Sequence, residues 1–118
     1  KIFIKNTILK SKKNNITEIN PEFKNILIKA NSLAVKNNSK FYFVYLPDFK
    51  RYKSNKKNLP YESVKKITQE LKIPLINIHS ILFEKEKDPL NFYTFKMDGF
   101  YTIEGYEKVA KSIYNSTN

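Results

Sequence analysis

Apolar residues recur along this chain with two different spacings, and the spacing predicts which segments are helices and which are strands. Helices are expected where apolar side chains return every three or four residues, because an α-helix repeats every 3.6 residues. By this criterion we predict helices over about 21–37, 60–72 and 103–115. Two short unbroken apolar runs, about 41–46 and 74–78, are typical of buried strands in a parallel sheet.

The same spacing indicates which face each helix buries. The first helix should begin at Asn20, a good N-cap, with Pro21 in the favoured first position. The last should begin after Thr102, another residue that caps helices well. The expected apolar faces are Phe23, Ile26, Leu27, Ala30, Leu33 and Ala34 in the first helix, and Tyr106, Val109, Ala110, Ile113 and Tyr114 in the last.

The order of these segments predicts the fold class. Helix, strand, loop, helix, strand, irregular segment, turn and helix is the order of an α/β protein with a parallel pair of strands. Residues 47–73 are long enough for the crossover that parallel strands need, and 47–59 within them are expected to form a loop. We interpret 20–118 as one α/β domain and 1–19 as an N-terminal extension.

Composition excludes several kinds of site. The chain has no cysteine, so disulfides, thiol catalysis and thiolate metal sites are excluded. His79 is the only histidine, so a site with several histidine ligands is excluded as well. His79 itself follows a strand, where sites form, but a lone histidine there is more often a hydrogen-bonded structural residue. No apolar run approaches the length of a membrane span.

The net charge of +11 raises the alternative of a basic α/β module that binds nucleic acid or another anionic polymer. Its candidate residues are Lys50, Arg51 and Lys53, which are interleaved with Phe49 and Tyr52. Two observations oppose it. No nucleic-acid-binding motif is present, and the abundance of lysine, asparagine and isoleucine together is what AT-rich codons produce.

A turn precedes the last helix, in Met97-Asp98-Gly99-Phe100-Tyr101-Thr102-Ile103-Glu104-Gly105-Tyr106. Asp-Gly favours a tight turn because glycine adopts positive φ without steric cost. This stretch resembles the last conserved block of the SGNH (GDSL-type) hydrolases, in which the catalytic histidine stands five residues before the helix glycine. Phe100 occupies that place, and a phenyl ring cannot transfer a proton. Asp98 is then either the remnant of an acid that once oriented the histidine, or simply part of the turn.

The resemblance extends over roughly 20–115. A helix leads into Phe-Val-Tyr-Leu-Pro, followed by Lys-Arg-Tyr, a second helix, Ile-Pro-Leu-Ile-Asn-Ile-His and Asp-Pro-Leu. This order is similar to the C-terminal half of a subgroup of bacterial SGNH hydrolases. It implies the last two strands of the flavodoxin-like SGNH fold, with ester hydrolysis or acyl transfer on a small ester, glycan or lipid, and no metal or cofactor.

The chain also departs from the family. It lacks the Gly-Asp-Ser block that holds the nucleophile and the Gly and Asn blocks of the oxyanion hole. With the base missing too, we expect no hydrolysis by this chain. Either it belongs with an N-terminal half that supplies the serine, or it is a degenerate relative. A third hypothesis is a docking module that recruits another chain through an open edge of the first strand.

Overall fold

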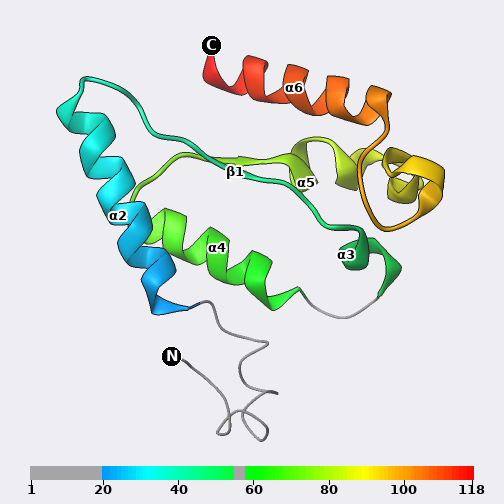
Figure 1. Cartoon of the computed structure of the whole chain (residues 1–118), viewed down its shortest axis with the longest axis horizontal. Coiled ribbons are helices and arrows are strands. Elements are labelled where there is room, and N and C mark those ends of the chain that lie inside the picture. The colour runs from blue at the N-terminus through cyan, green and yellow to red at the C-terminus, as the bar shows by residue number, and fades with distance from the viewer. Residues whose placement is uncertain (1–19, 55–57) are drawn as a thin grey trace, which may run out of the picture. The chain divides into compact units, whose positions relative to one another are not determined.

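The computed structural model describes residues 20–54 and 58–118. These residues form a mixed α/β structure that is mostly helical and contains one small parallel sheet (Figure 1). The predicted extension 1–19 lies outside the described residues. Contacts within the chain divide it into two compact units. Of the described residues, 20–41 and 58–74 belong to the first unit, and 42–54 and 75–118 belong to the second.

The first unit holds helices α2 (Pro21–Lys36) and α4 (Leu59–Glu70), close to the predicted bounds. Each begins at an asparagine whose side-chain oxygen accepts a backbone N–H of the first turn. Asn20 accepts from Glu22 at 2.8 Å, and Asn58 accepts from Tyr61 at 2.9 Å. These caps, each followed by a proline in the first turn, explain why both helices start where they do.

The buried side of α2 is narrower than predicted. Leu27 is buried, whereas Ile26 and Leu33 are each 61% exposed. Both were expected on the apolar face, so that part of the prediction is wrong. In α4, Tyr61 and Val64 are buried. A polar residue, Thr68, is buried beside them, and its hydroxyl donates to the carbonyl of Val64 at 2.8 Å, which satisfies the hydroxyl within the helix.

The second unit contains the sheet, which consists of strands β1 (Phe43–Tyr45) and β2 (Leu75–Asn77). They pair in parallel with Val44 opposite Ile76. The predicted parallel pair is therefore confirmed, although each strand is shorter than the apolar run that predicted it. Of the flanking residues, Tyr42 packs against the core and Ile78 belongs to it, whereas Leu46 is 51% exposed.

The segment predicted as a loop over 47–59 contains a short helix, α3 (Phe49–Lys53). Asp48 caps it and accepts from the backbone N–H of Lys50 at 3.4 Å. Phe49 belongs to the core of the second unit, and its ring meets Tyr93 edge to face at 5.4 Å. The loop prediction was wrong here because the charged residues of this segment show no helical periodicity. The single helical turn is held in place by one buried aromatic residue, Phe49.

Beyond β2 the chain forms short helical turns around an aromatic core. These are α5 (Ile78–Ile81), η1 (Phe83–Lys85), η2 (Pro89–Phe92) and η3 (Thr94–Lys96). Phe83 is fully buried, and its ring lies 4.5 Å from that of Phe92. Phe95, in the same segment, is 86% exposed. The core of this unit comprises Phe49, Ile76, Ile78, Phe83, Phe92, Tyr93 and Val109.

The last helix, α6 (Ile103–Thr117), follows the predicted turn. Gly99 has φ 144°, as expected for a glycine in the Asp-Gly turn. The hydroxyl of Thr102 accepts from the N–H of Gly105 at 2.9 Å, which confirms the predicted cap. A Cβ on Gly105 would lie 3.0 Å from the carbonyl oxygen of Phe92, so this position needs a glycine for close packing. No helix in the described part of the chain has the length and hydrophobicity needed to span a bilayer.

Removing the cap of α6 should destabilise the protein. We expect Thr102→Ala to lower the free energy of unfolding by about 1 kcal/mol, because the N–H of Gly105 loses its acceptor. Thr117→Ala, at the other end of the same helix, is the matched control and should change it by less than about 0.5 kcal/mol. Urea unfolding followed by circular dichroism measures both, and equal effects would contradict a capping role.

Candidate functional site

The carboxyl ends of β1 and β2 lie side by side, with Tyr45 opposite Asn77 in the parallel register. Beyond β1 the chain passes through Pro47 into α3, and beyond β2 it enters α5 directly. Ligands of open α/β sheets bind at this end of the strands. We call the residues gathered there the strand-end rim, defined by Pro47, Tyr52, His79, Tyr93 and Tyr101.

The backbone carbonyl of Pro47 organises the rim. It accepts hydrogen bonds from the hydroxyl of Tyr93 at 2.9 Å and from the hydroxyl of Tyr101 at 2.7 Å. Both tyrosines come from the segment before α6, and an antiparallel bridge pairs them with each other. The hydroxyl of Tyr101 therefore points into the protein and not at water. The segment 93–101 is thereby fastened to the end of β1.

The environment of these two tyrosines keeps them protonated. Burial is the main cause that raises the pKa of Tyr93 far above the ordinary tyrosine value, and neighbouring phenols and Asp48 act in the same direction. Burial likewise raises the pKa of Tyr101 strongly. A phenol in a buried site loses solvation when it ionises. Tyr93 and Tyr101 therefore serve as hydrogen-bond donors and not as bases.

The imidazole of His79 is part of the same rim. Its Nδ1 lies 2.7 Å from the hydroxyl of Tyr52, and the two rings are stacked with centroids 5.7 Å apart. Tyr52 also stacks on Phe83, with centroids at 5.5 Å, which connects the pair to the core. When the tyrosine donates, Nδ1 is the acceptor and the imidazole proton is on Nε2. His79 is thus hydrogen-bonded, as the sequence analysis expected.

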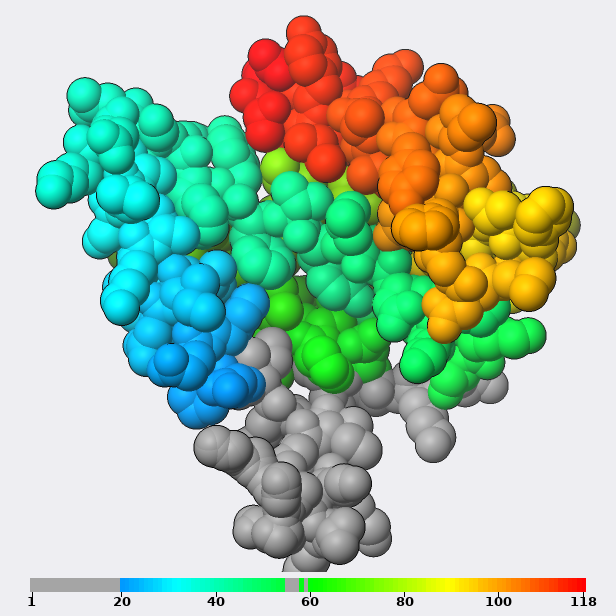
Figure 2. Space-filling model, viewed as in Figure 1, coloured from blue at the N-terminus to red at the C-terminus, as the bar shows by residue number. Residues whose placement is uncertain are grey.

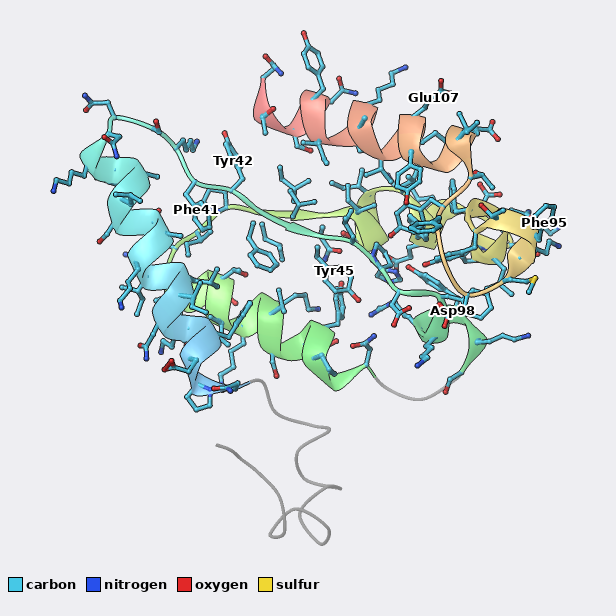
Figure 3. The ribbon with its side chains drawn as sticks, viewed as in Figure 1. Phe41, Tyr42, Tyr45, Phe95, Asp98 and Glu107 are labelled. Atoms are coloured by element: carbon cyan, nitrogen blue, oxygen red, sulfur yellow. The ribbon has the colours of Figure 1, made fainter. Side chains whose placement is uncertain are left out.

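Asp98 and Phe100, the two candidates from the turn, are both exposed to solvent. Phe100 is 78% exposed, and its backbone carbonyl accepts from the N–H of Thr94 at 3.0 Å. Figure 3 shows Asp98 on the loop between η3 and α6, and Phe95 at the outer tip of the same segment. The turn is therefore held by its backbone, and these side chains are free to meet solvent or a ligand.

The three basic candidates on α3 do not form one exposed group. Lys50 and Lys53 are exposed, whereas Arg51 is partly buried. The guanidinium carbon of Arg51 lies 5.9 Å from the ring centroid of Tyr52, within range of a cation–π interaction. Two exposed lysines alone offer little to a polyanion, which is bound through several phosphate contacts. Binding through this trio stays a prediction that the geometry does not favour.

The rim lacks the parts of a nucleophilic mechanism within the described residues. The hydroxyl of Ser80 donates to the carbonyl of Asn77 at 3.2 Å, while the Nδ1 of His79 is occupied by Tyr52. The described residues also contain no group of three or more His, Cys, Asp or Glu side chains that could hold a metal ion. The arrangement can donate hydrogen bonds and present apolar surface, but it has no activated nucleophile.

Sequence reasoning missed the roles of Pro47 and Tyr52. Pro47 acts through a backbone carbonyl, which has no signature in the sequence. Tyr52 was expected in a charged loop as a stacking residue, and it instead joins the core beside His79. The only available signal was the density of tyrosine, eight residues in the chain, because a buried tyrosine hydroxyl needs a hydrogen-bond partner.

Removing both hydroxyls should cost more than the sum of the single losses. We expect Tyr93→Phe or Tyr101→Phe to lower the free energy of unfolding by about 0.5–1.5 kcal/mol each. The double variant should lose about a further 1 kcal/mol, because the carbonyl of buried Pro47 then loses both donors. Urea unfolding of the four proteins measures the coupling. Tyr114→Phe on the outer side of α6 is the control, and simple additivity would contradict a shared acceptor.

The same tyrosines should make the fold sensitive to alkali. Because the pKa values of Tyr93 and Tyr101 are raised in the folded state, unfolding releases protons above about pH 10, where free tyrosine ionises. Their contribution to stability is complete below that pH and is lost as the pH rises. We expect the free energy of unfolding to fall more steeply between about pH 9.5 and 11 in the wild type than in the double phenylalanine variant. Parallel curves would contradict this prediction.

Comparisons with protein-family models, with curated proteins and with solved structures found no match to this chain. Its function must therefore be argued from the arrangement of its own residues and from the motifs of its sequence.

Proposed function

We propose that this chain is the C-terminal part of an SGNH (GDSL-type) hydrolase-like domain with a flavodoxin-like fold, and that it has no hydrolytic activity of its own. In this proposal the strand-end rim corresponds to one wall of the active site of the active family members. Phe100 stands in that wall where those enzymes have the histidine that transfers the proton.

One hydrogen bond carries the proposal. The hydroxyl of Tyr101 donates to the carbonyl of Pro47 at 2.7 Å, two residues beyond the end of β1. Position 100 is the neighbour of that anchor in the sequence. Its side chain is exposed, and its backbone is tied to the segment that reaches the carboxyl end of a parallel strand. This is where a catalytic base of an α/β enzyme is useful, because substrates bind at that end of the sheet.

The packing of α6 gives further support. The similarity to the family includes a glycine in the first turn of the last helix, and Gly105 is buried where a larger residue would crowd the Phe92 carbonyl. Thr102, three residues before Gly105, caps this helix and so fixes where it starts. The spacing from position 100 to the helix is therefore constrained by packing, even though residue 100 itself is no longer a histidine.

The chemistry explains why this chain should be inactive. In an SGNH-type mechanism a serine attacks the ester carbonyl while the histidine takes its proton, and backbone N–H groups stabilise the oxyanion. Phe100 can perform none of these steps, and the sequence has no Gly-Asp-Ser block. Asp98 then has no imidazole at position 100 to orient. We therefore assign Asp98 to the turn.

The proposal also identifies the partner and substrate class. An N-terminal half that carries the serine is the expected partner, and a small ester or a glycan ester is the expected ligand of the combined site. Ester hydrolysis of this type needs no cofactor, since the nucleophile, the base and the oxyanion donors are all protein groups.

An ester assay tests the proposal directly. We expect the folded chain to hydrolyse a fluorogenic acetyl ester no faster than the same chain carrying His79→Gln, and no faster than the urea-unfolded chain. These controls matter because a free imidazole or amine cleaves activated esters slowly without any site. Turnover by the folded chain at more than about tenfold the unfolded rate, about 1.4 kcal/mol in barrier, would show a working site and contradict the proposal.

The coding sequence upstream of Lys1 provides the second arm. If it encodes a Gly-Asp-Ser block, the longer protein should gain at least about a hundredfold in kcat/KM from Phe100→His, because a positioned general base contributes that much or more. Phe100→Gln, which is polar but cannot act as the base, is the matched control. A gain with glutamine equal to that with histidine would show that position 100 is not the place of the base.

A further inference from the structure

Helix α6 has apolar residues that the second unit leaves exposed to solvent. Val109 and Ile113 point toward the core, as predicted, whereas Tyr106 and Tyr114 of the same expected face are 48% and 66% exposed. Ile103, in the first turn, is 82% exposed. Figure 2 shows the orange-to-red atoms of α6 with their outer side uncovered in this view. The exposed apolar residues of this face are Ile103, Tyr106, Ala110 and Tyr114.

These four residues form one stripe along the helix. Their spacing of three, four and four residues returns to the same side of an α-helix. The stripe is about 16 Å long, at 1.5 Å per residue between Ile103 and Tyr114. Single exposed apolar residues need no explanation, but a continuous stripe of this kind is the pattern by which helices pack against other helices.

The charges beside the stripe are ordered along the helix. Glu104 and Glu107 lie in its first half, and Lys108 and Lys111 follow them, so one flank passes from acidic to basic. All four are exposed. Glu104 and Lys108 form a loose pair at 3.9 Å, whereas neither Glu107 nor Lys111 has an ion-pair partner within residues 20–54 and 58–118. Figure 3 shows Glu107 on the side of α6 away from β1.

We propose that this face binds the same face of a second copy of the chain, with the two α6 helices antiparallel about a twofold axis. An antiparallel arrangement reverses the charge order, so that Glu107 of each copy meets Lys111 of the other. It also places Ile103 opposite Tyr114, and Tyr106 opposite Ala110, which pairs large side chains with smaller ones. A twofold interface requires such self-complementarity, and this helix has it in both charge and shape.

Other arrangements are less favourable. Parallel α6 helices would bring acidic residues against acidic ones and align the two helix dipoles in the same direction. Association through any surface faces the repulsion between chains of net charge +11, and the α6 face opposes it with pairs of opposite charge between the two copies. A single pair of helices is also smaller than the standard interface of about 1,600 Å². The dimer should therefore be specific but weak, with dissociation constants of about 10 µM to 1 mM.

Sedimentation velocity on the whole chain, from about 10 µM to 1 mM, should show a reversible shift of the average mass from 14.0 kDa toward twice that value. Tyr114→Asp should abolish the shift, because it buries a charge in the stripe without removing a core contact. Circular dichroism verifies that this variant is folded. A wild-type chain that stays monomeric over the whole range overturns the proposal.

Charge exchange tests the antiparallel geometry. Glu107→Lys alone and Lys111→Glu alone should each weaken the dimer about tenfold, since each homodimer then contains two repulsive pairs. An equimolar mixture of these two variants should associate about as well as the wild type, because lysine at 107 of one copy meets glutamate at 111 of the other. Failure of the mixture to recover overturns the antiparallel arrangement and with it the proposal.

Matched charge changes outside α6 complete the experiment. Glu84→Lys and Lys87→Glu alter the net charge by the same amounts at exposed positions of the same unit. Neither should change the dissociation constant by more than about twofold. If these controls weaken association as much as the α6 variants do, the effect is one of net charge, and the proposed face is not the interface.

Discussion

The carbonyl of Pro47 is the acceptor on which the second unit depends. It lies just beyond the last residue of β1, where the ladder of hydrogen bonds has ended and a buried carbonyl would otherwise lack a donor. Tyr93 and Tyr101 supply two hydroxyls to it. An unsatisfied buried acceptor costs about 1–3 kcal/mol. The two tyrosines therefore fix both ends of the η3 segment against the strand and set the position from which α6 begins.

The local signals in the sequence were reliable because they act over only a few residues. Asn20 and Thr102 were predicted as caps from residue type and spacing, and each accepts a backbone N–H two or three positions later. Asn58 caps α4 in the same way, although it was placed in a loop. The parallel pair of strands was also predictable, because a helix between two short apolar runs leaves few alternatives. What failed was the choice of buried face in α2 and α6. Periodicity shows which residues are apolar, but not which of them a neighbouring element covers.

The candidate site was even harder to predict from the sequence than the buried faces of the helices. Position 100 was singled out through a resemblance to a motif, which relates it to Gly105 along a single stretch of chain. The rim itself is made by contacts between residues far apart in sequence: Tyr101 reaches Pro47 over 54 positions, and Tyr52 reaches His79 over 27. Nothing in the local sequence predicts such pairs, and one partner is a backbone atom.

Tyrosine has one role in the strand-end rim and another on the outer face of α6. Tyr93 and Tyr101 are buried, with pKa values raised by burial, so they are committed to holding structure and are unsuited to proton transfer. Tyr106 and Tyr114, a few residues later, are exposed and contribute rigid, amphipathic surface of the kind that protein interfaces favour. The turn between these two pairs of tyrosines fixes where α6 begins, and hence the surface that α6 presents.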